Sequence, residues 1–77
     1  PLMRDDLGRA SWSLLHTMAA YYPREPKDEE KRSMNEFIRS FAQHFPCPEC
    51  RADFQEEMNK SPPDVTDRFR LSQWMCE

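Results

Sequence analysis

Residues 27–45 read KDEEKRSMNEFIRSFAQHF, and Pro46 follows directly. The large apolar residues of this stretch recur at the i, i+3, i+4, i+7 spacing of one helical face: Met34, Phe37, Ile38, Phe41 and Phe45. The spacing predicts an amphipathic helix over Lys27–Phe45 that buries one stripe and ends at the proline. Periodicity alone leaves open whether Phe37, Phe41 and Phe45 face the core or a second copy of the chain.

A first helix is predicted over residues 7–22, with Asp5 and Asp6 as candidate caps at its start and Pro23 as its stop. Its apolar stripe is expected to consist of Leu7, Leu14, Leu15, Met18 and Tyr22.

Two shorter helices complete the pattern. A third opens around Cys47 and ends before Pro62, and a fourth starts between Asp64 and Asp67 and runs through Met75. No β-alternation or internal repeat competes with this reading, so the predicted class is all-α. Because the fourth helix meets no Gly, Asn or Pro before the chain ends, we expect residues 1–77 to be a single, incomplete domain.

The composition of the 77-residue chain excludes several classes of protein. Its formal net charge is −3, with the two signs interspersed, so there is no clustered positive face of the kind that nucleic-acid binding needs. No apolar run approaches a membrane span, and no signal peptide is visible within it. A chain this short usually needs a disulfide, metal, cofactor or partner for stability.

Cys47-Pro48-Glu49-Cys50 is the strongest chemical signal. At the start of a helix, free backbone N–H groups favour a thiolate, which makes such a pair a reactive, exchangeable disulfide. The alternatives are a structural bridge or a zinc site. Zinc sites usually use four ligands, and the remaining Cys76, His16 and His44 have spacings that fit no common finger. We therefore favour the redox-active disulfide and expect no metal.

Cys76 is left over from this pair. It has a partner outside the chain, or it is a buried free thiol. The open chain end favours the first alternative.

The first helix carries a second distinctive face. Arg9, Trp12 and His16 gather opposite the apolar stripe, and Gly8, the only glycine, lies beside them. A flat aromatic wall with polar groups and a fixed cation suits a planar, phosphate-bearing cofactor, and a glycine permits close approach. The alternative is a Trp12 packed on a neighbouring helix, with a hydrogen-bonded His16.

Together these motifs resemble the Erv/ALR family of FAD-linked sulfhydryl oxidases, most closely its animal mitochondrial members. The likeness extends from about Leu7 to Glu77, with the motifs in family order: Gly8-Arg9-Ala10-Ser11-Trp12, Leu14-Leu15-His16, Tyr21-Tyr22-Pro23, Phe45-Pro46-Cys47-Pro48-Glu49-Cys50 and Trp74-Met75-Cys76.

The resemblance implies a four-helix bundle with FAD at one end, of which this chain covers three helices and the start of the fourth. It implies that Cys50 lies next to the flavin, that Cys47 exchanges with substrate, and that Cys76 forms a structural disulfide with a later cysteine. The cofactor-site residues that it implies are Gly8, Arg9, Trp12, His16, Tyr22, Glu49 and Cys76. The family's His-Asn-x-Val-Asn segment is absent after Glu77, so this fragment is expected to bind FAD weakly or to be inactive by itself.

The implied activity is FAD-dependent formation of disulfides in protein substrates, with electrons passing to oxygen, giving hydrogen peroxide, or to cytochrome c. The implied partners are a mitochondrial import oxidoreductase as thiol substrate and a second copy of the chain in a homodimer. The implied location is the mitochondrial intermembrane space, with cytosolic or secreted forms as further options. Two rival functions are a redox-inert helical protein-binding module and a flavin-free thiol–disulfide exchanger.

Overall fold

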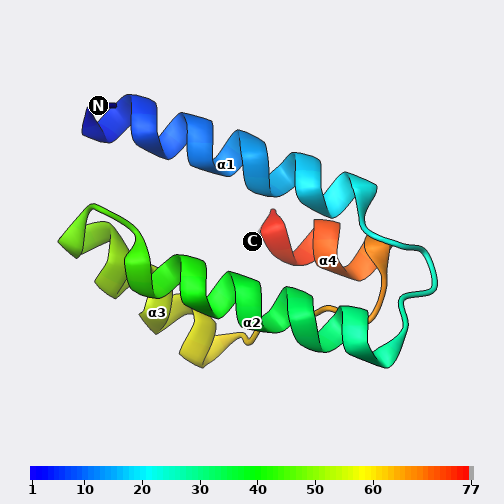
Figure 1. Cartoon of the computed structure of the whole chain (residues 1–77). Coiled ribbons are helices and arrows are strands. Elements are labelled where there is room, and N and C mark those ends of the chain that lie inside the picture. The colour runs from blue at the N-terminus through cyan, green and yellow to red at the C-terminus, as the bar shows by residue number, and fades with distance from the viewer. Residues whose placement is uncertain (77) are drawn as a thin grey trace.

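The computed structural model describes residues 1–76, and Glu77, the last residue of the motif pattern, lies outside them. It contains α1 (Arg4–Tyr21), α2 (Asp28–His44), α3 (Pro48–Lys60) and α4 (Arg68–Met75), joined by short loops (Figure 1). Every regular element among the described residues is a helix, which confirms the predicted all-α class. Across that same range, no helix combines the length and the apolar character that crossing a bilayer requires.

The start of α1 differs from the prediction. The helix begins at Arg4, and Met3 is its N-cap without a side-chain hydrogen bond. Asp5 and Asp6, expected as caps, instead lie in the first turn. Negative side chains there interact favourably with the free N–H groups of the helix end. Asp6 also accepts a hydrogen bond from the Arg9 guanidinium at 2.7 Å.

The other helix starts follow from local sequence. The backbone N–H of Lys27 donates to the Glu30 carboxylate at 2.8 Å, which is half of a capping box at the start of α2. At the start of α4, the Asp67 carboxylate accepts from the backbone N–H of Arg70, also at 2.8 Å. Each bond satisfies a donor that the first turn of a helix leaves free.

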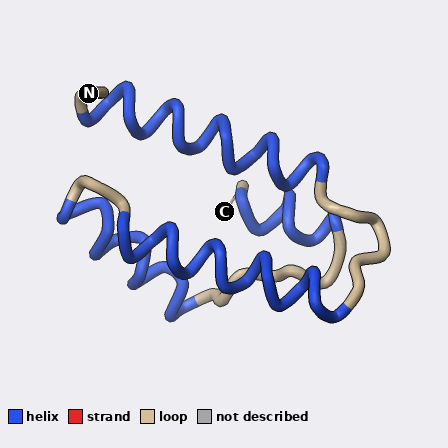
Figure 2. Tube along the Cα trace, viewed as in Figure 1, coloured by secondary structure: helices blue, strands red, loops and turns tan. Residues whose placement is uncertain are grey.

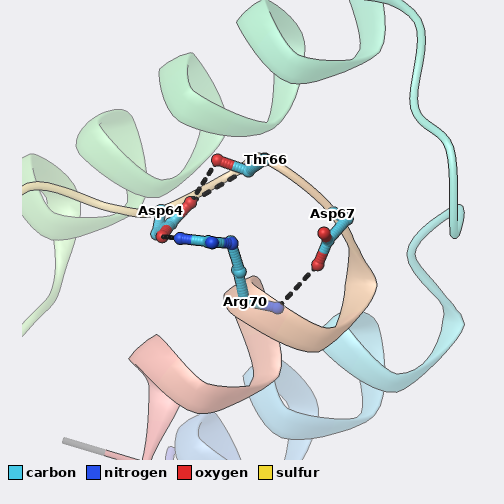
Figure 3. A network of polar contacts seen from close by, with 4 residues as sticks. All are labelled: Asp64, Thr66, Asp67 and Arg70. Carbon is cyan, nitrogen blue, oxygen red and sulfur yellow. Dashed lines mark hydrogen bonds and ion pairs between the residues drawn. The ribbon is translucent and has the colours of Figure 1, made fainter.

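A polar network orders the loop before α4 (Figure 3). The Thr66 hydroxyl donates to the Asp64 carboxylate at 2.6 Å, and Arg70 lies 3.7 Å from the other carboxylate oxygen. The Thr66 hydrogen bond, assisted by Arg70, lowers the pKa of the Asp64 carboxyl below its usual value. The loop is thereby fixed against the helix that it precedes.

The helices pack as two pairs, α1 with α4 and α2 with α3. The three most deeply buried large side chains, Leu15, Ile38 and Leu71, come from α1, α2 and α4, so one core joins the two pairs. The other buried members are Ala19, Tyr22, Ala42, Met58 and Met75. The expected α1 stripe was too broad, because Leu14 is 52% exposed and Ala19 takes its place toward α4.

The phenylalanines of α2 divide between core and surface. Phe41 packs against the core, with its ring centroid 5.9 Å from that of Phe37 and 5.7 Å from that of Phe45. Phe37 lies at the exposed end of this row. Periodicity left open whether these three phenylalanines face the core or a second copy of the chain, and the structure shows a core position for Phe41 alone.

The end of α1 is tied to the loop before α4. The Tyr22 hydroxyl donates to the Val65 carbonyl at 2.9 Å, and Arg68 Nε donates to the Tyr22 carbonyl. The α1–α2 connection and the part of the α3–α4 connection that enters α4 accordingly lie at the same end of the molecule (Figure 2). Burial, and secondarily the charge of Glu30, raises the pKa of the Tyr22 phenol above its usual value of 10.0.

Tyr22→Phe tests this tie. We expect it to lower the free energy of unfolding by about 1 kcal/mol, because the partly buried Val65 carbonyl loses its donor. The neutral phenol favours the folded state, so its contribution is complete below pH about 10 and is lost as the pH rises further. Urea unfolding at neutral and alkaline pH should therefore show a smaller alkaline loss in the variant. Tyr21→Phe, at the exposed neighbour, is the control, and equal effects of the two changes would contradict the assignment.

Candidate functional site: a disulfide beside an aromatic cavity

The Cys47–Cys50 disulfide lies at the start of α3, as predicted. Cys47 is the N-cap in extended conformation, and Pro48 occupies the first helical turn, where its missing N–H costs nothing. The backbone N–H of Cys50 points at Cys47 Sγ, 3.3 Å away. This donor and the helix end would both stabilise a thiolate on Cys47, the property that makes a disulfide exchangeable.

An aromatic cavity of about 320 Å³ opens beside Cys50. On one side the Trp12 ring of α1 stacks on the Phe54 ring of α3, with centroids 6.0 Å apart and planes inclined by 20°. Phe41 of α2 meets Phe54 edge-on at 6.4 Å. The carboxylates of Asp53 and Glu57 also line the cavity. Its walls therefore offer flat apolar surfaces and a few hydrogen-bond acceptors, which suits a planar organic group with N–H donors.

A second, more open cavity of about 670 Å³ adjoins the first and shares Gly8, Trp12 and Cys50 with it. Its lining adds three basic residues, Arg4, Arg9 and His16, together with Asp5 and Ser13. Guanidinium and imidazole groups are suited to bind phosphate or carboxylate oxygens. The two adjoining cavities thus differ in character, the first apolar and the second rich in basic groups.

Trp12 and His16 lie on the face of α1 that borders these cavities. Trp12 is not opposite the whole apolar stripe, as the sequence predicted, because Leu15 of that stripe lines the apolar cavity with it. The ring centroids of Trp12 and His16 are 6.0 Å apart, and the planes are inclined by 43°. Trp12 does pack on a neighbouring helix, as the alternative held, yet 44% of it remains exposed. It therefore has surface left for a ligand.

Gly8 leaves an opening in the α1 wall. Its φ is not positive, and a Cβ placed on it would meet no atom within 4 Å. Neither backbone conformation nor packing in this structure requires glycine there. The absence of a side chain at Gly8 leaves space where the two cavities meet.

Three of the expected cofactor residues lie outside both cavities. Tyr22 is buried at the far end of α1 and bonded to Val65. Glu49 is on the surface beside the disulfide, where it pairs with Arg4. Cys76 is a free thiol at the end of α4, and its exposure rules out the alternative of a buried thiol. Their roles toward a cofactor remain predictions.

Part of the cavity wall was not among the predicted site residues. Phe54 follows Cys50 by one helical turn and so shares its face, a spacing that was available from the sequence. Trp74 was assigned to the fourth helix and to a family motif but not to the site; its indole Nε1–H donates to the Ser61 carbonyl at 2.9 Å, and both residues line the apolar cavity. That contact joins α4 to the end of α3, which no local pattern reveals.

For the zinc alternative, the geometry offers no ligand set: among residues 1–76, no group of three or more His, Cys, Asp or Glu side chains lies close enough to hold a metal ion.

Fold and site together define an all-α protein with a disulfide at the edge of an aromatic cavity. A sequence model of the Erv1/Alr family matches residues 9–77, and the chain belongs to this family.

The relatives are similar over nearly the whole chain. The mitochondrial FAD-linked sulfhydryl oxidase ERV1 of Saccharomyces cerevisiae is 42% identical over 95% of this chain and 39% of its own length. The FAD-linked sulfhydryl oxidase ERV1 of Arabidopsis thaliana is 37% identical over 99% of this chain and 40% of its own length. The crystal structure of the yeast Erv1 core superposes with a TM-score of 0.96 at 41% identity, covering 99% of this chain and 64% of that one. The chain therefore spans about two-fifths of the length of these two curated relatives.

Gly8→Ala tests the assignment of Gly8 to an open wall. A glycine within a helix costs about 0.5–1 kcal/mol relative to alanine, and no atom opposes the added methyl group. We expect the cofactor-free protein to gain about that much stability in urea unfolding. A loss of stability would instead mean that glycine is needed for close packing.

Proposed function

We propose that this chain provides the reactive disulfide and one wall of the cofactor site of an FAD-dependent thiol oxidase that forms disulfides in protein substrates. The observation that carries the proposal is the position of Cys50, which belongs to a disulfide at a helix start and also lines the aromatic cavity. A purely structural bridge has no need of such a neighbour. The names of the relatives support the same activity.

The residues present fit FAD. The stacked Trp12 and Phe54 rings offer a wall to a planar ring system, and the opening at Gly8 leaves room beside it. Arg9 and His16 border the adjoining cavity, where they would hold phosphate oxygens. When bound, FAD supplies a ring system that accepts two electrons from a dithiol and passes them to an acceptor.

The two cysteines divide the thiol chemistry. A substrate thiolate attacks Cys47 Sγ, a mixed disulfide forms, and Cys50 leaves as a thiolate. A second substrate thiolate then attacks the substrate sulfur of that mixed disulfide and releases Cys47 as a thiolate. The substrate has lost two electrons and two protons, and the Cys47–Cys50 pair has gained the two electrons. The reduced Cys50 lies on the cavity side, where a bound cofactor would accept them.

Further parts of the proposal concern partners and location. We propose oxygen, giving hydrogen peroxide, or cytochrome c as the final acceptor, and a mitochondrial import oxidoreductase as the thiol substrate. The names of several relatives support a mitochondrial location, and we propose the intermembrane space. We also propose a homodimer, which would cover exposed apolar side chains such as Leu14 and Tyr21.

Serine substitutions test the disulfide. In the full-length protein, Cys47→Ser and Cys50→Ser should each lower kcat/KM for dithiol oxidation by about a hundredfold or more, because neither variant can form the exchanging bond. Oxygen consumption with a dithiol substrate gives the rate, and visible absorption gives the flavin content. Asn59→Ser, an exposed change near the other end of α3, is the control and should leave the rate unchanged. Full activity of Cys47→Ser would sink the proposal.

A leucine at position 8 tests the cofactor wall. Gly8→Leu should weaken FAD binding about tenfold or more, because the added side chain occupies the opening shared by the two cavities. Ala10→Leu adds the same side chain to an exposed position that lines neither cavity and should leave the affinity unchanged. Flavin fluorescence titration of the apoprotein measures both. Equal affinities in the two variants would contradict the placement of FAD beside Gly8, and a protein that binds no flavin at all would favour the exchanger or the binding module.

A further inference from the structure

Among residues 1–76, the two halves of α1 make different contacts. In Figure 1, α4 lies beneath the C-terminal half of α1, and the N-terminal half extends beyond it. The Cα atoms of α1 stay more than 8 Å from those of α2 and α3. Gly8, Arg9 and Trp12 belong to the N-terminal half, and within the described residues this half meets α3 through side-chain contacts beside the cavities.

Two such contacts stand out. One is the Trp12–Phe54 stack in the middle of the wall. The other is an ion pair at the outer end, where Arg4 Nη1 lies 3.6 Å from Glu49 Oε2. Among the described residues, this pair is the one hydrogen bond or ion pair that joins α1 to α3. Glu49 itself lies between the two cysteines of the disulfide.

Helix stability does not account for the place of Arg4. It is the first residue of α1, and a positive charge at a helix N-terminus opposes the helix dipole. Glu49, in the first turn of α3, carries the charge that the dipole favours. An arginine at this position is therefore better explained by its ion pair with Glu49 of α3 than by the stability of α1.

We propose that Arg4 is a positioning residue: by pairing with Glu49 it clamps the N-terminal half of α1 to the disulfide helix and sets the width of the cofactor site. The inference rests on the proposed FAD site for its functional consequence, while the clamp itself is a property of the cofactor-free protein. Both side chains are well exposed, at 67% and 79%, so the effect is modest and screened by salt.

The chain offers a matched control. Lys60 and Glu56 also lie 3.6 Å apart, with both side chains 66% exposed, but both belong to α3. Lys60→Gln therefore removes an ion pair of the same distance and similar exposure that spans no cavity. Any effect of Arg4→Gln beyond that of Lys60→Gln belongs to the connection between the helices.

The experiment compares Arg4→Gln, Glu49→Gln, their double variant and Lys60→Gln in the full-length protein. Hydrogen exchange of the cofactor-free protein reports the clamp directly. We expect amides of residues 8–12 to exchange about threefold faster in each single variant than in the wild-type protein. The double variant should exchange at the same rate as the single variants, and Lys60→Gln should exchange at the wild-type rate. Flavin fluorescence should show that FAD binds about threefold more weakly to Arg4→Gln, Glu49→Gln and the double variant than to the wild-type protein. At high salt the affinity of the wild-type protein should fall toward that of these variants.

Each other result overturns the proposal. Exchange rates in Arg4→Gln equal to those in Lys60→Gln would mean that no clamp exists. Additive effects in the double variant would mean that the two residues act separately. Weaker FAD binding in Arg4→Gln with tighter binding in Glu49→Gln would make Arg4 a direct ligand of the anionic cofactor. If no variant bound FAD, the proposed function would fail, whereas the exchange rates would still decide whether the clamp exists.

Discussion

The packing of α1 on α4 is the contact on which the rest of the structure depends. Leu15 and Ala19 of α1 share a buried core with Leu71 and Met75 of α4, and Tyr22 fixes the end of α1 to the loop before that helix. Among the described residues, α4 lies along the C-terminal half of α1. The N-terminal half borders the two cavities, and the candidate site lies along it.

The features that sequence predicted are those that local chemistry determines. Prolines and apolar periodicity located four helices, and the C-x-x-C spacing located a disulfide at a helix start. Errors arose where local rules are ambiguous. Asp5 and Asp6 suit a cap and a first turn equally well, and a stripe that included Leu14 was wider than the face that α4 covers. The aromatic wall built by Phe54 and Phe41 required the pairing of α3 with α2, which no single-helix pattern contains.

The two cavities explain why the site combines residues of such different chemistry. Phe54 and Trp12 offer apolar surface to a flat ring, and the exposed Arg9 and His16 offer polar groups to an anion, although Arg9 already pairs with Asp6. One ligand with a planar apolar end and a charged middle would contact both sets of residues. A small apolar ligand would make no use of Arg9 and His16, and a simple anion would leave the aromatic wall in water. The disulfide adjoins both cavities through Cys50, so the same ligand would lie within reach of its sulfur.

Stability and function are therefore linked through one helix. A segment with few buried contacts opens locally at low free-energy cost, and the N-terminal half of α1 has fewer such contacts than the half that packs on α4. A ligand that touches both Trp12 and Cys50 would bind only while that half is closed, so its binding free energy would stabilise the closed arrangement. Ligand binding would therefore order the N-terminal half of α1. Further packing on this half would raise the stability of the protein but would fill the proposed cofactor site.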